Sequence, residues 1–337
     1  MVISRRSVLC GLGATAALTS ASLRLTAAGL EPALDNQSAT RTPQSAMTGF
    51  RLSILTDEIS QDLDHALAVA SREFGLGYVD LREAHGKNVM KWDAAAVGEA
   101  RRLLERYRLR VACIASPIFK VDWPGAPKSP FSPQRDEFGA DFTFEQQDEL
   151  LERAFDLARA FNTDRIRIFD FWRLEDQKPH RAAMDDAVRG AAVKAGKRGL
   201  TLVLENEYAC NTATGAEAAR LLNAIREPAL QLTWDPGNAA FRGETPFPDG
   251  YAKLPKDRIG HVHCKDAVAR PDGKGWEWMA MGRGVIDWAG QFRALKQDGY
   301  RLATTLETHW RGAGTPEESS RQSFAGMKAL LKKADAL

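Results

Sequence analysis

The sequence has few cysteines, and their spacing does not form a recognisable framework. Four cysteines occur in 337 residues, at positions 10, 113, 210 and 264. This wide, uneven spacing predicts neither a disulfide-bonded scaffold nor a Cys-x-x-Cys zinc motif. A glycine-rich loop of the kind that cradles phosphate groups is also missing. These absences argue against a disulfide scaffold, a cysteine-held zinc module and a phosphate-binding loop.

An excess of charge of either sign is missing as well. The 46 basic residues nearly balance the 44 acidic residues, which leaves a net charge of +2. Such a balance creates no overall field that would attract nucleic acid or an anionic membrane. We therefore expect a small-molecule partner. At this length, with 44% hydrophobic residues, one large domain is favoured over two small ones.

The N-terminal segment lacks an apolar run suited to a permanent transmembrane helix, because it contains Arg24 and many small residues. It carries Arg5 and Arg6, a modestly apolar stretch, and small residues up to Ala28. It resembles a twin-arginine export signal. The predicted organisation is a signal peptide over residues 1–28, a flexible linker over 29–48 and a single folded domain over 49–337.

The resemblance to an export signal implies a periplasmic or secreted protein that crosses the membrane already folded, with any metal in place. After cleavage no stable membrane anchor is expected. The alternative for this segment is an amphipathic or disordered leader that is not cleaved.

From Phe50 onward, short apolar runs alternate with longer segments of helical periodicity. This alternation is typical of repeated strand–helix units and a parallel sheet. Eight runs, with a helix after nearly every one, predict an α/β fold, the (β/α)8 TIM barrel. The predicted strands are 51–56, 77–85, 110–116, 165–172, 201–205, 230–235, 258–264 and 301–307. The predicted helices are about 62–74, 94–107, 145–161, 182–198, 215–225, 287–299 and 316–334.

Two segments interrupt the alternation. Residues 116–144 are rich in proline and aromatic residues, and they are too long for an ordinary connection. We expect a loop packed over the active-site face, with a disordered insertion as the alternative. Residues 266–286, rich in glycine and tryptophan, predict a second loop on that face.

Several of the apolar runs end in residues able to hold a metal. The runs end at Glu205, Asn206 and Glu207, at Asp235, at His261, His263, Lys265 and Asp266, and at Glu307, and their carboxylates and imidazoles are the metal-ligand candidates. In a barrel of parallel strands, the C-terminal ends converge on one face, where active sites lie. Carboxylates and an imidazole form a mixed oxygen and nitrogen set that suits one divalent ion, Mn²⁺, Mg²⁺, Co²⁺ or Zn²⁺. Any one of these residues alone could simply mark a strand reaching solvent.

The sequence resembles the xylose-isomerase-like TIM-barrel superfamily of sugar phosphate isomerases and epimerases. The superfamily also contains inosose dehydratases and apurinic-site endonucleases. The resemblance covers about residue 50 to the end. It rests on LEN at Glu205, DPGN at Asp235, HVHCKD at His263 and LET at Glu307. It implies that these four residues are the metal ligands, and that Glu205 and Glu307 face each other across a sugar as catalytic base and acid.

The same resemblance assigns supporting roles to neighbouring residues. It places His261 one layer deeper in the barrel, either as a buried histidine with its hydrogen bonds made or as a residue that supports the ligands. It gives Asn206 and Asp266 the same supporting role. Two departures from the family pattern stand out: Arg283 within GRGVIDW, where many relatives carry an acidic residue, and Glu207, where several relatives have histidine.

Further residues near strand ends are candidates for binding sugar hydroxyls. They are Glu58, Glu83, His85, Glu207 and Lys265. The alternative is that they are solvent-facing strand ends. Trp172, Trp276 and Trp310 are candidates for stacking on a sugar ring.

Three classes of enzyme fit this pattern. The first is a metal-dependent isomerase or epimerase that removes a proton next to the carbonyl of a sugar or keto-sugar, through an enediolate. The second is a lyase or hydrolase of the same fold, such as an inosose-type dehydratase or an enzyme that cleaves 3-keto-glycosides. The third is an apurinic-site endonuclease-like phosphodiesterase, which the export signal and the balanced charge disfavour. A non-catalytic sugar-binding protein would not need two opposed glutamates.

Overall fold

The structure is a computed structural model, and it describes residues 49–132 and 138–337. Eight parallel strands form a sheet in the order β1-β12-β9-β8-β7-β6-β5-β2, and a parallel bridge between Leu55 and Asp80 joins its two ends. The strands are β1 (Arg51–Ile54), β2 (Tyr78–Leu81), β5 (Arg110–Ile118), β6 (Arg165–Ile168), β7 (Thr201–Glu205), β8 (Leu230–Trp234), β9 (Ile259–Cys264) and β12 (Ala303–Leu306). The predicted TIM barrel is confirmed.

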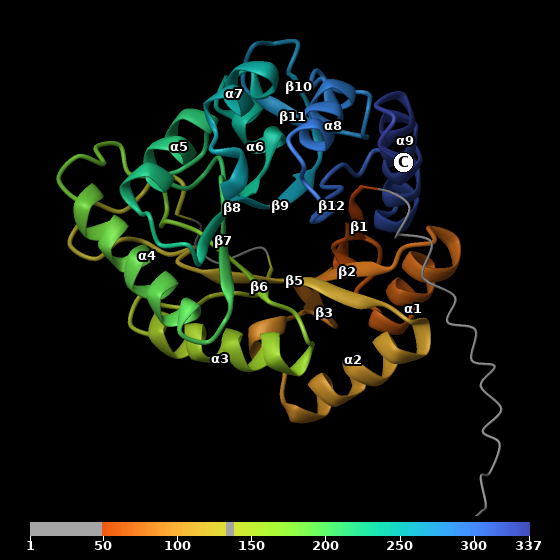
Figure 1. The fold of residues 1–337 in the computed structure, drawn as a ribbon, viewed down its shortest axis with the longest axis horizontal. Coiled ribbons are helices and arrows are strands. Elements are labelled where there is room, and N and C mark those ends of the chain that lie inside the picture. The colour runs from red at the N-terminus through yellow and green to blue at the C-terminus, as the bar shows by residue number, and fades with distance from the viewer. Residues whose placement is uncertain (1–48, 133–137) are drawn as a thin grey trace, which may run out of the picture. The chain divides into compact units, whose positions relative to one another are not determined.

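Helices surround the barrel (Figure 1). They are α1 (Leu63–Ala68), α2 (Ala94–Tyr107), α3 (Gln147–Ala160), α4 (Arg181–Gly196), α5 (Gly215–Ala224), α6 (Pro236–Phe241), α7 (Tyr251–Lys253), α8 (Trp288–Gln297) and α9 (Pro316–Lys333). Side chains of Asp62, Asp93, Thr214, Asp287 and Thr315 accept backbone N–H groups at the starts of α1, α2, α5, α8 and α9. Such caps satisfy donors that have no partner within a helix. The predicted helices therefore begin close to where the structure starts them.

The strands have one apolar face and one polar face. In β7 and β8, Leu202, Leu204, Leu232 and Trp234 belong to the hydrophobic core. Since successive side chains of a strand point to opposite faces, the residues between them point to the other side of the sheet. On that inner side β9 carries His261 and His263, both buried. This alternation places the polar strand residues inside the barrel.

Three predicted segments differ from the structure. The second strand ends at Leu81, and Glu83–Ala84 (β3) pairs instead with Lys87–Asn88 (β4) in a small antiparallel hairpin. The fourth strand ends at Ile168 and not near residue 172, because Phe171 adopts a positive φ of 70°, which a strand cannot continue through.

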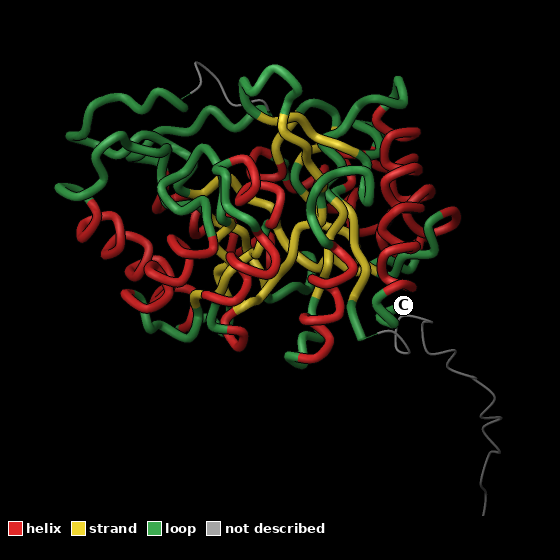
Figure 2. Tube along the Cα trace, turned by 90° about the horizontal axis from the view of Figure 1, so that it is seen from above, coloured by secondary structure: helices red, strands yellow, loops and turns green. Residues whose placement is uncertain are grey.

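The predicted loop over residues 266–286 also differs, because it contains a second antiparallel hairpin. Strand β10 (Asp266–Ala269) pairs with β11 (Trp276–Met279). Long loops and this hairpin gather at one end of the barrel (Figure 2).

The loop over residues 116–144 packs against the barrel where it is described. The Trp123 ring contacts the rings of Phe144 and Phe171, and the Phe138 ring lies 3.8 Å from the guanidinium carbon of Arg82. The described parts of this loop are therefore packed over the barrel, as the aromatic residues predict.

The predicted signal peptide and linker lie outside the described residues. In the part of the chain that the structure describes, no helix is long and apolar enough to cross a membrane. Cys113, Cys210 and Cys264 are free and buried.

Candidate active site

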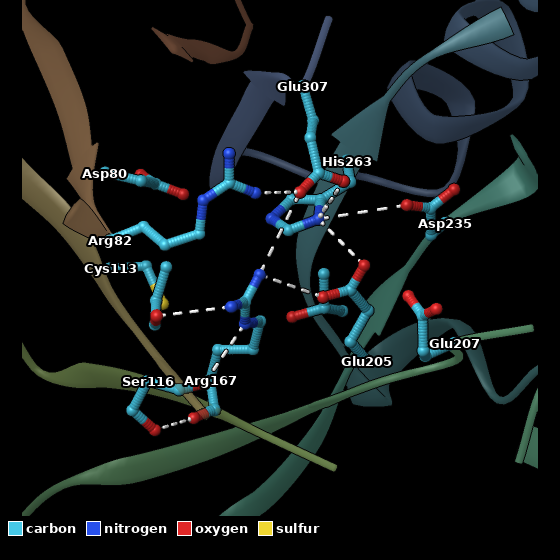
Figure 3. Close-up of polar contacts among 12 residues, drawn as sticks. Asp80, Arg82, Cys113, Ser116, Arg167, Glu205, Glu207, Asp235, His263 and Glu307 are labelled. Atoms are coloured by element: carbon cyan, nitrogen blue, oxygen red, sulfur yellow. Dashed lines mark hydrogen bonds and ion pairs between the residues drawn. The ribbon is translucent and has the colours of Figure 1, made fainter. Parts of the chain in front are cut away.

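Four side chains meet where β7, β8, β9 and β12 end. The Nδ1 atom of His263 lies 3.1 Å from Glu205 Oε1, 3.3 Å from Glu307 Oε2 and 3.8 Å from Asp235 Oδ2. All four residues are at most 2% exposed, and Figure 3 shows them pointing toward one another. Ligand atoms held about 2.0–2.2 Å from one ion lie about 3 Å or more apart. The predicted ligand set is thus brought together at a spacing that suits a single divalent ion.

The donor chemistry of this set fits a divalent cation. Three carboxylates and one imidazole provide hard oxygen donors and a borderline nitrogen donor. Asp235 Oδ2 is buried, and among the described residues it accepts no hydrogen bond, although Lys265 Nζ lies 2.8 Å away. The four residues each offer a ligand atom that lies within 4.8 Å of the other three. A buried carboxylate oxygen in such a group is suited to metal coordination.

The charges of the four residues shift one another's pKa values. Burial works to lower the pKa of His263, but the carboxylates of Glu205 and Glu307 outweigh it and raise the pKa to about 10. Burial raises the pKa of Asp235 to about 7, against the opposing charge of Lys265. The imidazole must lose its proton to bind a metal, so metal binding at this site releases a proton.

Lys265 lies against the ligands and not on the cavity wall. Its Nζ is 2.6 Å from Glu307 Oε2 and 2.8 Å from Asp235 Oδ2, and the residue is 1% exposed. Its stem passes over α6 at Gly237, where a Cβ atom would lie 2.7 Å from Lys265 Cγ. The predicted substrate-binding role of Lys265 remains a prediction.

Arg82, which the sequence analysis missed, ties the predicted ligand Glu307 to the first strand. Its Nη1 donates to Glu307 Oε1 at 2.8 Å, its Nη2 to Glu58 Oε1 at 2.7 Å and its Nε to Asp57 Oδ2 at 2.8 Å. Glu58 Oε2 also accepts from Arg311 at 2.6 Å. Glu58, predicted to bind sugar hydroxyls, is thus fully buried behind two arginines.

Two residues with predicted supporting roles, His261 and Asn206, lie near the predicted ligands. His261 Nε2 lies 2.8 Å from Asp80 Oδ2 and 2.9 Å from Thr305 Oγ1, deeper in the barrel than His263. Asn206 Oδ1 accepts from the backbone N–H of Asp235 at 2.7 Å, and its Nδ2 donates to the Asp235 carbonyl at 2.8 Å. Asn206 is thus hydrogen-bonded to the backbone of Asp235, whereas His261 is hydrogen-bonded to residues outside the predicted ligand set, and the supporting roles of both remain predictions.

Asp266 supports the loop that follows β11. Its carboxylate accepts from the backbone N–H groups of Gly282, Gly284 and Ile286 at 3.0 to 3.3 Å. A Cβ atom at Gly284 would lie 2.0 Å from Asp266 Oδ1. The loop that carries Arg283 therefore requires glycine where it crosses this carboxylate.

A cavity of about 260 Å³ opens above the ligands. Its described lining is Arg82, Lys120, Phe138, Arg167, Phe169, Glu205, Glu207, Tyr208, Trp278, Glu307, His309 and Arg311. A larger cavity of about 630 Å³ is lined by Trp172 and by residues within 120–132 and 140–145. Since none of the ligands lines the larger cavity, we assign the substrate site to the smaller one.

The predicted sugar-binding residues are distributed unevenly around this cavity. Glu207 lines it, and its Oε2 accepts from Asn238 Nδ2 at 3.2 Å. Glu83 and His85 lie in and beside the β3–β4 hairpin and are not part of the described lining. Their predicted roles remain predictions.

The aromatic lining also differs from the prediction. The cavity is lined by Trp278, whereas Trp172 lines the larger cavity. Neither Trp276 nor Trp310 is in the described lining of either cavity.

The sequence contained a signal for one of the missed arginines. In RIRI of β6, arginine alternates with isoleucine, and Ile166 and Ile168 belong to the core. The alternation directs Arg167 toward the barrel interior. A charged residue inside a buried strand is rare without a partner or a function, so this pattern marks a site residue.

Comparison with known proteins identifies the family. The sequence profile described as Xylose isomerase-like TIM barrel matches residues 68–330. The chain belongs to this family. A comparison with curated proteins found no match.

Solved structures share the fold. One is described as the IOLI protein with a bound zinc atom, at 15% identity, a TM-score of 0.64 and coverage of 86% of this chain and 99% of the other. A D-allulose 3-epimerase from Methylomonas sp. matches at 19% identity, a TM-score of 0.61 and coverage of 85% and 98%. The probable 3-DHS dehydratase AsbF from Bacillus anthracis matches at 17% identity, a TM-score of 0.61 and coverage of 83% and 98%.

At these identities the likeness shows the fold alone. One further match, a fusion of a xylose isomerase-like TIM barrel with a 4-hydroxyphenylpyruvate dioxygenase, is covered over only 43% of its length. The chain therefore corresponds to the barrel part of that protein at most.

Proposed function

We propose that this family member is a divalent-metal-dependent isomerase or epimerase acting on a sugar or keto-sugar. The observation that carries the proposal is the pair of buried glutamates, Glu205 and Glu307, which lie on either side of His263 Nδ1 and both line the cavity. Two opposed carboxylates can remove and return a proton on either side of a substrate carbon. The relatives that bear epimerase and dehydratase names, and the one with a bound zinc atom, support this class.

A divalent ion held by Glu205, Asp235, His263 and Glu307 would supply Lewis-acid stabilisation of the enediolate that proton removal creates. The two glutamates remain ionised at neutral pH. Although burial opposes it, His263 and Arg167 hold the pKa of Glu205 below its ordinary value. Likewise, despite burial, Lys265 and His309 keep the pKa of Glu307 well below its usual range. Both side chains are thus ionised and can accept a proton, and their lowered pKa values make them weaker bases than a free carboxylate.

An elimination on the same site is the second candidate. Loss of water or of a glycosidic group from a keto-sugar begins with the same proton removal. Glu207 favours this candidate, because it is a carboxylate on the cavity wall outside the ligand set. It could donate a proton to a leaving group while Glu205 or Glu307 acts as the base.

Deuterium exchange tests the proposed function. The metal-loaded protein, incubated in D₂O with keto-sugars and 3-keto-glycosides, should incorporate deuterium at the carbon next to the carbonyl, as followed by NMR. Recovery of a stereoisomer identifies an epimerase, and release of water or an aglycone identifies a lyase. If every carbonyl compound tested retained its protons with metal bound, proton abstraction would be ruled out as the activity.

Export by the twin-arginine pathway is proposed from the N-terminal sequence, which contains Arg5 and Arg6. Changing both to lysine should leave the protein in the cytoplasm at its unprocessed size, because the pathway reads the arginine pair. Cell fractionation and immunoblotting measure this. Changing Arg24 to lysine is the matched control and should leave processing unchanged. Normal export of the double-lysine variant would contradict the assignment.

A further inference from the structure

Arg167 is oriented in the wall of the cavity by two backbone carbonyls and by the carboxylate of Glu205. Its Nε donates to the Ser116 carbonyl at 3.3 Å and its Nη2 to the Ala115 carbonyl at 3.2 Å, both on β5. The Phe169 ring lies 4.9 Å from its guanidinium carbon. The side chain is 6% exposed, yet it lines the cavity. The two carbonyls orient the guanidinium but carry no charge, so its charged contacts are with the acidic side chains beside it (Figure 3).

The carboxylates near Arg167 are both proposed metal ligands. Among the described residues, those within 4.0 Å are Glu205, at 3.2 Å from its Nη1, and Glu307, at 4.0 Å. Arg82 differs, because Asp57 and Glu58, which are not in the ligand set, also contact it. When Glu205 and Glu307 hold a divalent ion, their negative charge is shared with the ion. Arg167 then has less negative charge beside it than Arg82, which keeps Asp57 and Glu58. A buried cation that lacks a neighbouring negative charge is costly, so it favours the binding of an anion beside it.

A second cation lies on the same wall. Lys120 Nζ is 5.0 Å from the centre of the Phe169 ring, so Lys120 and Arg167 both approach that ring. Both residues line the cavity. Lys120 lies two residues after the end of β5, and Arg167 lies in the neighbouring strand β6. The wall formed by β5 and β6 thus presents two positive groups to a substrate.

We propose that Arg167 and Lys120 form a carboxylate subsite, and that the substrate is a sugar acid and not a neutral sugar. This inference rests on the proposed function, since it assigns the substrate class of the same site. A planar guanidinium pairs with a carboxylate through parallel hydrogen bonds, and an ammonium adds a point charge. The cavity of about 260 Å³ is smaller than the roughly 300–1,000 Å³ typical of sites for drug-sized ligands, which suits a single small sugar acid.

A matched pair of probes tests the subsite. 2-Keto-D-gluconate and D-fructose differ only at C1, where one carries a carboxylate and the other a hydroxymethyl group. Binding of each to the Mn²⁺-loaded protein is measured by calorimetry. The sugar acid should bind at least roughly 10-fold more tightly, the scale of one hydrogen-bonded charge pair. Equal affinity for the two probes would overturn the proposal.

Variants assign the preference to the two cations. Arg167→Gln should remove most of the preference for 2-keto-D-gluconate, measured as the ratio of its affinity to that of D-fructose in the same variant, because the charged contact with the carboxylate is lost. Arg167→Lys keeps the positive charge and should retain part of the preference for 2-keto-D-gluconate. Lys128→Gln, on an exposed lysine that lines only the larger cavity, is the control and should change neither affinity. If Arg167→Gln fails to fold in a thermal unfolding scan, Lys120→Gln provides the same comparison.

Two outcomes separate the subsite from the proposed function. If Arg167→Gln lowered kcat but left both affinities unchanged, Arg167 would act on the enediolate and the carboxylate subsite would be wrong. If D-fructose exchanged its proton in D₂O while the sugar acid gained no affinity, the proposed function would stand without the subsite. If the sugar acid bound through Arg167 but neither probe nor any other carbonyl compound of the panel exchanged its proton, the subsite would stand and the proposed function would fail.

Discussion

Replacing Glu205 or Glu307 by glutamine is expected to lower catalytic activity by roughly 10²- to 10⁴-fold, the contribution typical of general acid–base catalysis. Glutamine keeps an oxygen that can approach a metal, but it cannot accept a proton. The two variants need not fail alike, because each glutamate serves its own side of the substrate. Each should first lose deuterium exchange of the proton on that side, measured by NMR in D₂O.

The structure adds a condition to this experiment. Glu307 pairs with Arg82 and Lys265, and Glu205 pairs with Arg167, so each substitution leaves a buried cation less compensated. Metal content and thermal unfolding should therefore be measured on the same samples. Glu149→Gln, on the exposed side of α3, is a control for loss of one negative charge.

If both variants bound metal normally and still exchanged the substrate proton near the wild-type rate, the glutamates would be ligands only. The base would then be sought among Glu58, Glu83, His85 and Glu207. Of these, Glu207 lines the cavity, so Glu207→Gln would be the next variant.

Removing a ligand should weaken metal binding strongly. His263→Ala and Asp235→Asn are each expected to lower the affinity for Mn²⁺ by roughly 10-fold or more, since supporting residues alone contribute about 10- to 100-fold. The reason is direct loss of a donor atom at the point where the four side chains converge. Calorimetric titration of metal-free protein gives the affinities, and wild-type protein should contain about one ion per chain.

His261→Ala provides the matched comparison on the same strand. His261 contacts Asp80 and Thr305, and among the described residues no hydrogen bond or ion pair joins it to Glu205, Asp235 or Glu307, so metal affinity should change much less. The variant should instead lose roughly 1–3 kcal/mol of stability, because the buried Asp80 carboxylate loses a hydrogen-bond partner. A larger loss of metal affinity in His261→Ala than in His263→Ala would mean that the ligand lies one layer deeper.

The fold could be predicted because its signal is local and repeated. Each strand has one apolar face that packs under helices, and each helix has a periodic apolar stripe, as in α2, whose predicted bounds match the structure. Helix caps such as Asp93 mark the starts. The two hairpins were missed because β3, β4, β10 and β11 are short, and strands of two to four residues leave almost no periodic pattern.

The candidate ligands could be predicted for a related reason. Each lies at or directly after the C-terminal end of an apolar strand, and parallel strands of a barrel bring those ends to one face. The spacing within HVHCKD, interpreted through the resemblance, separated His263 from His261. In contrast, the sequence analysis placed Glu83 and His85 on the same face, and the structure turns that segment into a hairpin beside the cavity.

The sequence by itself determined the barrel, the strand ends and the four side chains that converge, since these follow from periodicity and position along a strand. Only the tertiary structure decided which cations accompany them. Arg82 reaches Glu307 across 225 positions of sequence, and Arg167 reaches Glu205 across 38. Such pairs depend on barrel closure, strand order and the length of each side chain, and none of these has a local signature in the chain.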